Sequence, residues 1–180
     1  MLQVFGFEKV GVAVSDLYFL DPVQKQGQEG AERGVRLEVR LLERQALRGS
    51  VYSAQPIGVG RPVWRADLLE QVAGPPGSFD RTHHHPRFEG WEPGGRHFEP
   101  ELSADPLAWV GAHLADLPAL LEAAGIPAGE VGERDAADLA AAVPEILEAT
   151  GRLLARVHAG ELGVAPVSAA ELTDARIGWL

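Results

Sequence analysis

Residues 35–41, Val-Arg-Leu-Glu-Val-Arg-Leu, decide the fold class of this chain. Apolar side chains occupy every second position, and arginine or glutamate fills the positions between them. Side chains of a β-strand point alternately to its two faces, so this pattern predicts a strand with one buried face and one polar face.

Period-two stretches on both sides of this strand extend the expected sheet. They cover residues 10–20, 51–59 and 63–72. A turn is expected at 48–50, before the second stretch, and another at 60–62, before the third. Short connections between successive strands favour antiparallel neighbours. We therefore expect the first part of the chain to form an antiparallel β-meander that ends in a histidine-rich segment.

The second part of the chain has the 3.6-residue period of helices. A first helix is expected between Ser103 and Gly125, with Pro118 bending or dividing it. A second helix is expected over about 135–159, bent at Pro144. The capping-box pattern Ser168-Ala-Ala-Glu171 predicts a last short helix.

Strands followed by helices indicate an α+β fold. The helical region, 103–180, is expected to pack on the sheet of residues 1–102 or to form a small subdomain. The chain has 180 residues, the length of one ordinary domain. Its composition, 46% hydrophobic and 23% charged, excludes a disordered or fibrous chain.

Charge and cysteine content exclude several classes of function. A total of 16 basic residues against 26 acidic ones gives a formal net charge of −10, which argues against a nucleic-acid partner. The absence of cysteine excludes disulfides, thiolate metal sites and thiol nucleophiles. The first 20 residues lack the pattern of a signal peptide, and no apolar run is long enough to span a membrane. We therefore expect a soluble cytoplasmic protein.

The histidine-rich segment is the candidate site, since it holds four of the six histidines. If residues 82–88 are extended, His83 and His85 project from the same face, with Cα atoms about 6.5–7 Å apart. Glu89 or His97 would supply a third ligand to a divalent metal ion such as zinc, manganese, iron or nickel. Such a ligand set leaves a coordination position open for water or substrate.

The same segment also allows a metal-free site. Histidine titrates near neutral pH, so His83 and His85 beside acidic residues would act as general base and general acid. Arg65 and Asp67 share the polar face of their strand and would extend either kind of site if that face adjoins the histidines. In a third interpretation the histidines are surface groups bonded to carboxylates, and Arg65 and Asp67 form a solvated ion pair.

The spacing His83-x-His85-x3-Glu89 resembles the first metal-binding motif of the cupins, and Pro93-Gly-Gly with His97 resembles their second. The resemblance implies a metal ion held by these histidines and the glutamate. A pair of strands separates the two motifs in cupins, whereas only three residues separate them here. Helices are also expected where the family has its later strands, so the resemblance concerns the local site and not the barrel.

Residues 35–122 resemble the TumE-type toxins of bacterial toxin–antitoxin modules in the order of their elements. The matching pieces are Trp64-Arg-Ala-Asp67, His83-His84-His85, Arg96-His97-Phe98 and the helix from Asp105. The family's Asp-Asn pair after the aromatic residue is Asp67-Leu68 here, and the tail from residue 126 is extra. The resemblance implies an intracellular protein with a histidine-centred site that acts on RNA.

Three functions remain open. The first is a hydrolase with a divalent-metal or acid/base site, acting on a small molecule or a phosphodiester. The second is a non-catalytic interaction module in which an apolar stripe on the second long helix forms a homodimer. That stripe consists of Val143, Ile146, Leu147, Leu153 and Leu154. The third is a toxin-like ribonuclease.

Overall fold

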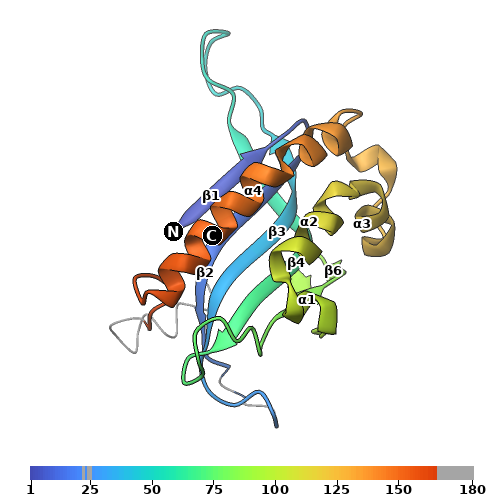
Figure 1. Cartoon of the computed structure of the whole chain (residues 1–180). Helices are drawn as coiled ribbons and strands as arrows, with labels where there is room; N and C mark the ends of the chain where they lie inside the picture. Colours follow the sequence, from blue (N-terminus) through green and yellow to red (C-terminus); the bar gives the residue numbers. More distant parts are fainter. Residues whose placement is uncertain (22, 24–25, 166–180) are drawn as a thin grey trace.

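The computed structural model describes residues 1–21, 23 and 26–165, in which strands come first and helices follow (Figure 1). The strands are β1 (Leu2–Gly6), β2 (Val10–Phe19), β3 (Glu32–Arg44), β4 (Ile57–Gln71), β5 (His83–His85), β6 (Phe88–Glu89) and β7 (Glu92–Pro93). The helices are α1 (Pro100–Ala104), α2 (Pro106–Ala115), α3 (Leu117–Ala124), the 3-10 turn η1 (Ala128–Glu130) and α4 (Asp135–His158). The predicted α+β class is confirmed.

The first five strands form one antiparallel sheet in the order β1-β2-β3-β4-β5, which is the predicted meander. β6 and β7 pair with each other in a separate small hairpin. The stretch 35–41 lies in the middle of β3, in the centre of the sheet. Its alternating pattern therefore sets which face of the sheet is apolar.

β4 is a single strand, although the sequence predicted two strands separated by a turn at 60–62. Pro62 has no N–H to donate to the β-ladder. The register of the pairing between β3 and β4 shifts on both sides of Arg40, the residue opposite Pro62. This irregularity lets the strand continue past the proline. A side chain at Gly60 would bring its Cβ within 2.8 Å of the Leu41 carbonyl oxygen, so the close approach of the two strands requires glycine there.

The connection between β3 and β4 projects beyond the sheet as a long arm (Figure 1). The sequence predicted a strand from residue 51, but the strand begins only at Ile57. Val51 and Tyr52, 85% and 95% exposed, lie in the turn of this arm instead. β-branched and aromatic residues favour strands where they pack against a neighbour, and here the chain is reversing direction.

The helices cover one face of the sheet, with α4 lying across β2 and β3 (Figure 1). Alternate residues of β2, β3 and β4 and the inner sides of α2, α3 and α4 form one hydrophobic core. The apolar stripe on α4 belongs to this core: Ile146, Leu153 and Leu154 are buried in it, and Val143 and Leu147 pack against it. The chain itself therefore covers the surface that suggested a homodimer.

The predicted capping residue Asp105 starts one helix, and the structure adds a second capping residue, Asp116. Asp105 caps α2 by accepting a hydrogen bond from Ala108 N, and Asp116 caps α3 in the same way through Ala119 N, both at 3.1 Å. Pro118 stands in the first turn of α3, so the predicted division at this proline is confirmed. α4 continues through Pro144.

Two further expectations concern a short helix near the end of the chain and membrane-spanning segments. The short helix predicted at 168–171 lies outside the described residues. Among the helices that are described, none combines the length and the apolar character that crossing a membrane requires.

Candidate metal centre

The polar face of the sheet carries two rows of charged and imidazole side chains, each spanning β3, β4 and β5. The pairing places Arg36, Asp67 and His83 in one row and Glu38, Arg65 and His85 in the next. Residues directly opposite each other on antiparallel strands point to the same face. The histidines therefore share a face with Arg65 and Asp67, which is the condition under which this pair was expected to extend the site.

Thr82 fixes the position of β5 at the edge of the sheet. Its buried hydroxyl donates to Leu69 O and accepts from Leu69 N, both at 3.0 Å. Arg81 N also donates to Leu69 O, at 3.1 Å. These contacts set the register of the short strand, which places the two histidines opposite Asp67 and Arg65.

Asp67, His83 and His85 form a compact group in which one oxygen is the common neighbour. His83 Nε2 lies 3.4 Å and His85 Nε2 lies 3.6 Å from Asp67 Oδ2. All three residues are buried, and their ligand atoms lie within 4.8 Å of one another. This group could hold a metal ion.

The backbone sets which nitrogen of each imidazole carries a proton when the ring is neutral. His83 Nδ1 lies 2.8 Å from Arg81 O, and His85 Nδ1 lies 2.8 Å from Gly94 O. A carbonyl oxygen only accepts hydrogen bonds, so each Nδ1 must carry a proton and donate it. In a neutral ring the lone pair is then on Nε2, the atom that faces Asp67.

Two arginines hold the carboxylate of Asp67. Arg36 donates from Nε to Oδ1 at 2.6 Å and from Nη2 to Oδ2 at 3.2 Å, and Arg65 Nε lies 3.4 Å from Oδ2. Burial by itself raises the pKa of a carboxyl, but the Arg36 guanidinium, followed by the two histidines and Arg65, holds the pKa of Asp67 well below its ordinary value. Asp67 is therefore an anion at neutral pH.

His85 is neutral under the same conditions. Burial lowers its pKa, and nearby Arg65 adds to this effect, while contact with Asp67 opposes it. A neutral imidazole is the form that binds a metal ion.

The β6–β7 hairpin lies over the polar face next to these residues. The Arg65 guanidinium lies 5.4 Å from the centroid of the Phe88 ring, and the Arg40 guanidinium lies 5.6 Å from that of Trp91. Glu38 pairs with both arginines, at 2.7 Å to Arg40 and 3.5 Å to Arg65. The hairpin therefore covers a network of paired charges rather than an apolar surface.

The structure does not bring Glu89 or His97, two of the predicted ligands, into this group. Phe88 faces Arg65, so the alternation of β6 directs Glu89 away from the sheet, and Glu89 is exposed. His97 forms an isolated bridge with His84, at 2.9 and 3.0 Å between their backbone atoms. Its ring lies against that of His84, with centroids 5.5 Å apart, on the other side of β5.

His84 belongs to an aromatic cluster on that other side. Its Nε2 lies 3.1 Å from Glu99 Oε1, and its ring lies 4.9 Å from that of Trp109. Trp109 stacks on His113, with ring centroids 3.6 Å apart. Burial lowers the pKa of His84 against the opposing effect of Glu99. These residues support the packing of β5 against α2.

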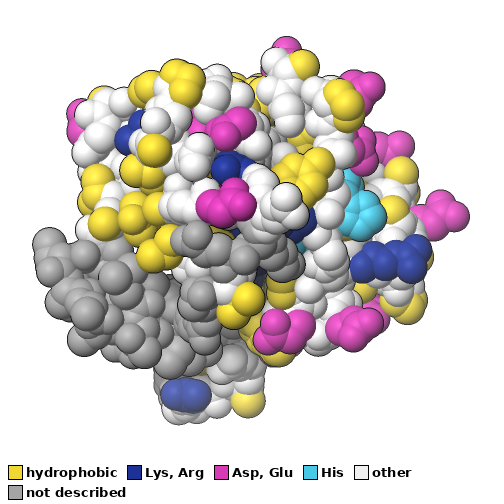
Figure 2. Space-filling view, turned by 90° about the horizontal axis from the view of Figure 1, so that it is seen from below, with side chains coloured by type: hydrophobic (Ala, Val, Ile, Leu, Met, Phe, Trp, Pro, Cys, Tyr) yellow, Lys and Arg dark blue, Asp and Glu magenta, His cyan; other side chains and the backbone are white. Residues whose placement is uncertain are grey.

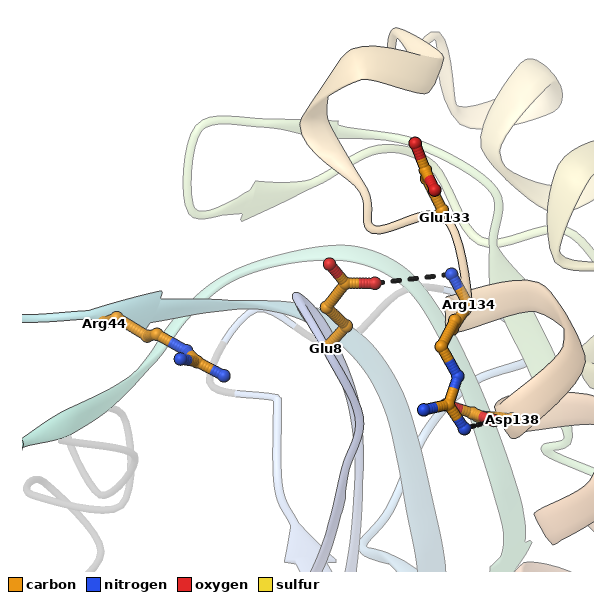
Figure 3. Close-up of a pocket in the computed structure, with 5 residues that line it drawn as sticks. All are labelled: Glu8, Arg44, Glu133, Arg134 and Asp138. Atoms are coloured by element: carbon orange, nitrogen blue, oxygen red, sulfur yellow. Dashed lines mark hydrogen bonds and ion pairs between the residues drawn. The ribbon is translucent and has the colours of Figure 1, made fainter.

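A separate charged hollow lies where the turn after β1 meets the start of α4 (Figure 3). It has a volume of about 380 Å³, and its lining residues are Glu8, Arg44, Glu133, Arg134 and Asp138. Arg134 donates to Glu8 from its backbone N and to Asp138 from Nη2, at 3.3 and 3.0 Å. None of the histidines lines this hollow. On the face shown in Figure 2, histidine side chains form one small exposed patch.

Sequence reasoning missed Arg36 and Glu38, the β3 partners of the site. Both belong to the alternating stretch 35–41, where their charges indicated only a solvent-facing side of the strand. The signal that could have found them was the pairing of β3 with β4, which the sequence does not specify. No protein-family model matches the chain, and comparison with curated proteins and with solved structures also gave no match.

Proposed function

We propose that Asp67, His83 and His85 bind a divalent metal ion and that the protein is a metal-dependent hydrolase. The observation that carries this proposal is the spacing of the ligand atoms. Two donors that each lie about 2.0–2.1 Å from a tetrahedral ion are themselves about 3.3–3.4 Å apart. The two histidine nitrogens lie 3.4 and 3.6 Å from Asp67 Oδ2. These distances exceed an ordinary hydrogen bond and fit donors arranged around one ion.

The backbone contacts of the two histidines support the same conclusion. Histidines that ligate metals almost always donate their other ring N–H to a carbonyl or carboxylate, which fixes the ring. Arg81 O and Gly94 O play this part for His83 and His85. In the neutral form of both rings, Nε2 is then free to bind an ion held beside Asp67 Oδ2.

Three protein ligands leave a fourth position for water, as in catalytic zinc sites. A bound ion would supply hydroxide at neutral pH by lowering the pKa of that water to about 7. Asp67 and the histidines would hold the ion in place. Arg65, whose Nε is 3.4 Å from Asp67 Oδ2, would stabilise negative charge that develops on the substrate.

Elemental analysis of untagged protein, purified without added metal, is expected to find about one zinc, manganese, iron or nickel ion per chain. His85→Ala should reduce this content to less than about a tenth, because the loss of one of three ligands removes most of the affinity. His97→Ala and Glu89→Gln are the matched controls, since they change the same segment outside the group. Metal-free wild-type protein that also fails to take up added zinc would contradict the proposal.

A second candidate function is metal-free phosphodiester cleavage, favoured by the two guanidinium groups at Asp67. They repel a cation and would stabilise an anionic transition state. In this alternative His83 and His85 exchange protons with the substrate, and RNA is the substrate to test. Cleavage that persists in EDTA and disappears in His85→Ala would favour it over the metal centre.

A further inference from the structure

The charges around the centre do not balance once a metal ion is added. Arg36, Arg40 and Arg65 face Glu38 and Asp67 across hydrogen-bonding or ion-pair distances, which gives a formal charge of +1 with neutral imidazoles. A divalent ion on Asp67 that carries a neutral water molecule raises this charge to +3. Excess charge in a buried environment is unfavourable unless an opposite charge compensates it.

The size of this excess positive charge indicates the charge of the anion that would compensate it. A dianion returns the formal charge to the +1 of the metal-free network, whereas a carboxylate or a phosphodiester neutralises only half of the metal charge. A phosphate monoester has a charge of nearly −2 at neutral pH, since its second pKa is about 6. Its oxygens can also bind a metal ion and accept hydrogen bonds from a guanidinium at the same time.

Arg65 has a donor available for such an oxygen. The residue is 9% exposed, and among the described residues its buried Nε has no hydrogen-bond partner. This nitrogen lies 3.4 Å from Asp67 Oδ2, the atom on which the ligand group converges. A buried donor without an acceptor is unfavourable. A ligand oxygen bound beside Asp67 Oδ2 would give the Arg65 Nε–H the acceptor that it lacks in the metal-free protein.

The arginine side of the centre is also the side nearer to solvent. The side chains of Asp67, His83 and His85 are 2%, 1% and 7% exposed, whereas those of Arg65 and Arg36 are 11% and 15% exposed. An anion arriving from solvent would therefore meet the guanidinium groups before the imidazoles.

We propose, on the basis of the metal-dependent function above, that the substrate presents a dianionic phosphoryl group. One phosphoryl oxygen joins the water on the metal ion, since catalytic zinc sites can expand to five ligands, and another accepts a hydrogen bond from Arg65 Nε. In hydrolysis, the oxygen of water forms the new bond to phosphorus and the bond to the ester oxygen breaks. The proton of the water passes to the leaving alkoxide, which gives an alcohol and inorganic phosphate.

The test measures inorganic phosphate binding to the protein loaded with cobalt(II), whose visible absorption reports on its ligands. Phosphate should change that spectrum and bind at least about tenfold more tightly than to metal-free protein. Arg65→Met should retain cobalt and lose phosphate affinity by about tenfold to a hundredfold, as expected for a charge-assisted hydrogen bond. Arg152→Met, on the exposed side of α4, is the matched control and should bind phosphate like the wild type.

The outcomes separate this inference from the function on which it rests. Cobalt binding without a phosphate effect, or phosphate binding that Arg65→Met leaves unchanged, would overturn the inference and leave the metal centre intact. Acetate binding as tight as phosphate binding would overturn the dianionic part. No cobalt binding at all would overturn both proposals. If Arg65→Met does not fold, Arg65→Lys keeps the charge, removes Nε and should weaken phosphate binding by about tenfold.

Discussion

Replacing Asp67 with asparagine is expected to abolish metal binding and to lower the free energy of unfolding of the metal-free protein by about 3–5 kcal/mol. The carboxylate is buried and accepts two hydrogen bonds from Arg36, with Arg65 beside it. An asparagine of the same shape leaves both guanidinium groups without that negative charge. Removing one partner of a buried ion pair is strongly destabilising because the other charge stays buried.

This loss should depend on pH. Arg36 and its neighbours hold the pKa of Asp67 well below its ordinary value, whereas an unfolded aspartate has a pKa of about 3.9. The stability that this ionised group contributes is therefore fully present above about pH 4–5. It decreases as the pH falls below the unfolded pKa towards the folded one. The difference between wild type and Asp67→Asn should thus be largest near neutral pH and smaller in acid.

Urea unfolding followed by circular dichroism, with and without added zinc, measures both effects of Asp67→Asn. Zinc at about 100 times its dissociation constant should stabilise the wild type by about 2.7 kcal/mol and leave the variant unchanged. Glu99→Gln is the matched control, since Glu99 is a carboxylate beside a histidine of the same strand on the other face. Equal zinc stabilisation of wild type and Asp67→Asn would be evidence against the metal centre.

The convergence of His83 and His85 followed from the sequence because it depends only on the alternation of a strand. Side chains two residues apart share a face whatever the strand pairs with, and the two rings have centroids 5.0 Å apart. Asp67 joins them only if two conditions hold. Its strand must pair with the strand of the histidines, and its side chain must point to the same face of the sheet as theirs. The sequence named the residue but could not establish those conditions.

The residues that the sequence placed incorrectly or overlooked depend on pairing between strands. His97 pairs with His84, so its side chain lies on the face opposite His83 and His85. Arg36 binds Asp67 because β3 and β4 pair in one particular register. A shift of one residue in that register would move the side chain to the other face. Such pairing is set by the packing of the whole sheet and leaves no local motif.

In the fold, too, features that depend on a few neighbouring residues were predictable, and features that depend on pairing between strands were not. The helix start at Asp105 was predictable, because a capping side chain and a following proline act within one turn. The sequence also suggested a turn at residues 60–62, where glycine and proline usually interrupt a strand. β4 continues there because its partner β3 runs alongside and absorbs the proline in a register shift.

Replacing Asp135 with alanine is expected to lower the free energy of unfolding by about 3–5 kcal/mol, an effect on stability away from the metal centre. The side chain is completely buried at the start of α4. Its oxygens accept hydrogen bonds from the backbone N–H groups of Glu8, Lys9, Val10 and Gly132, at 2.6–3.3 Å. This carboxylate therefore joins the turn between β1 and β2 to the first turn of α4.

Alanine at this position leaves those backbone donors without an acceptor and removes a negative charge from the positive end of the helix dipole. Asp135→Asn keeps one acceptor oxygen and should lose less stability, while metal content stays at the wild-type level in both variants. Asp138→Ala, in the same turn of α4 but paired with Arg134 near the surface, should lose about 0.5 kcal/mol or less. Urea unfolding measures all three, and a loss for Asp135→Ala no larger than that for Asp138→Ala would show that water replaces the buried carboxylate.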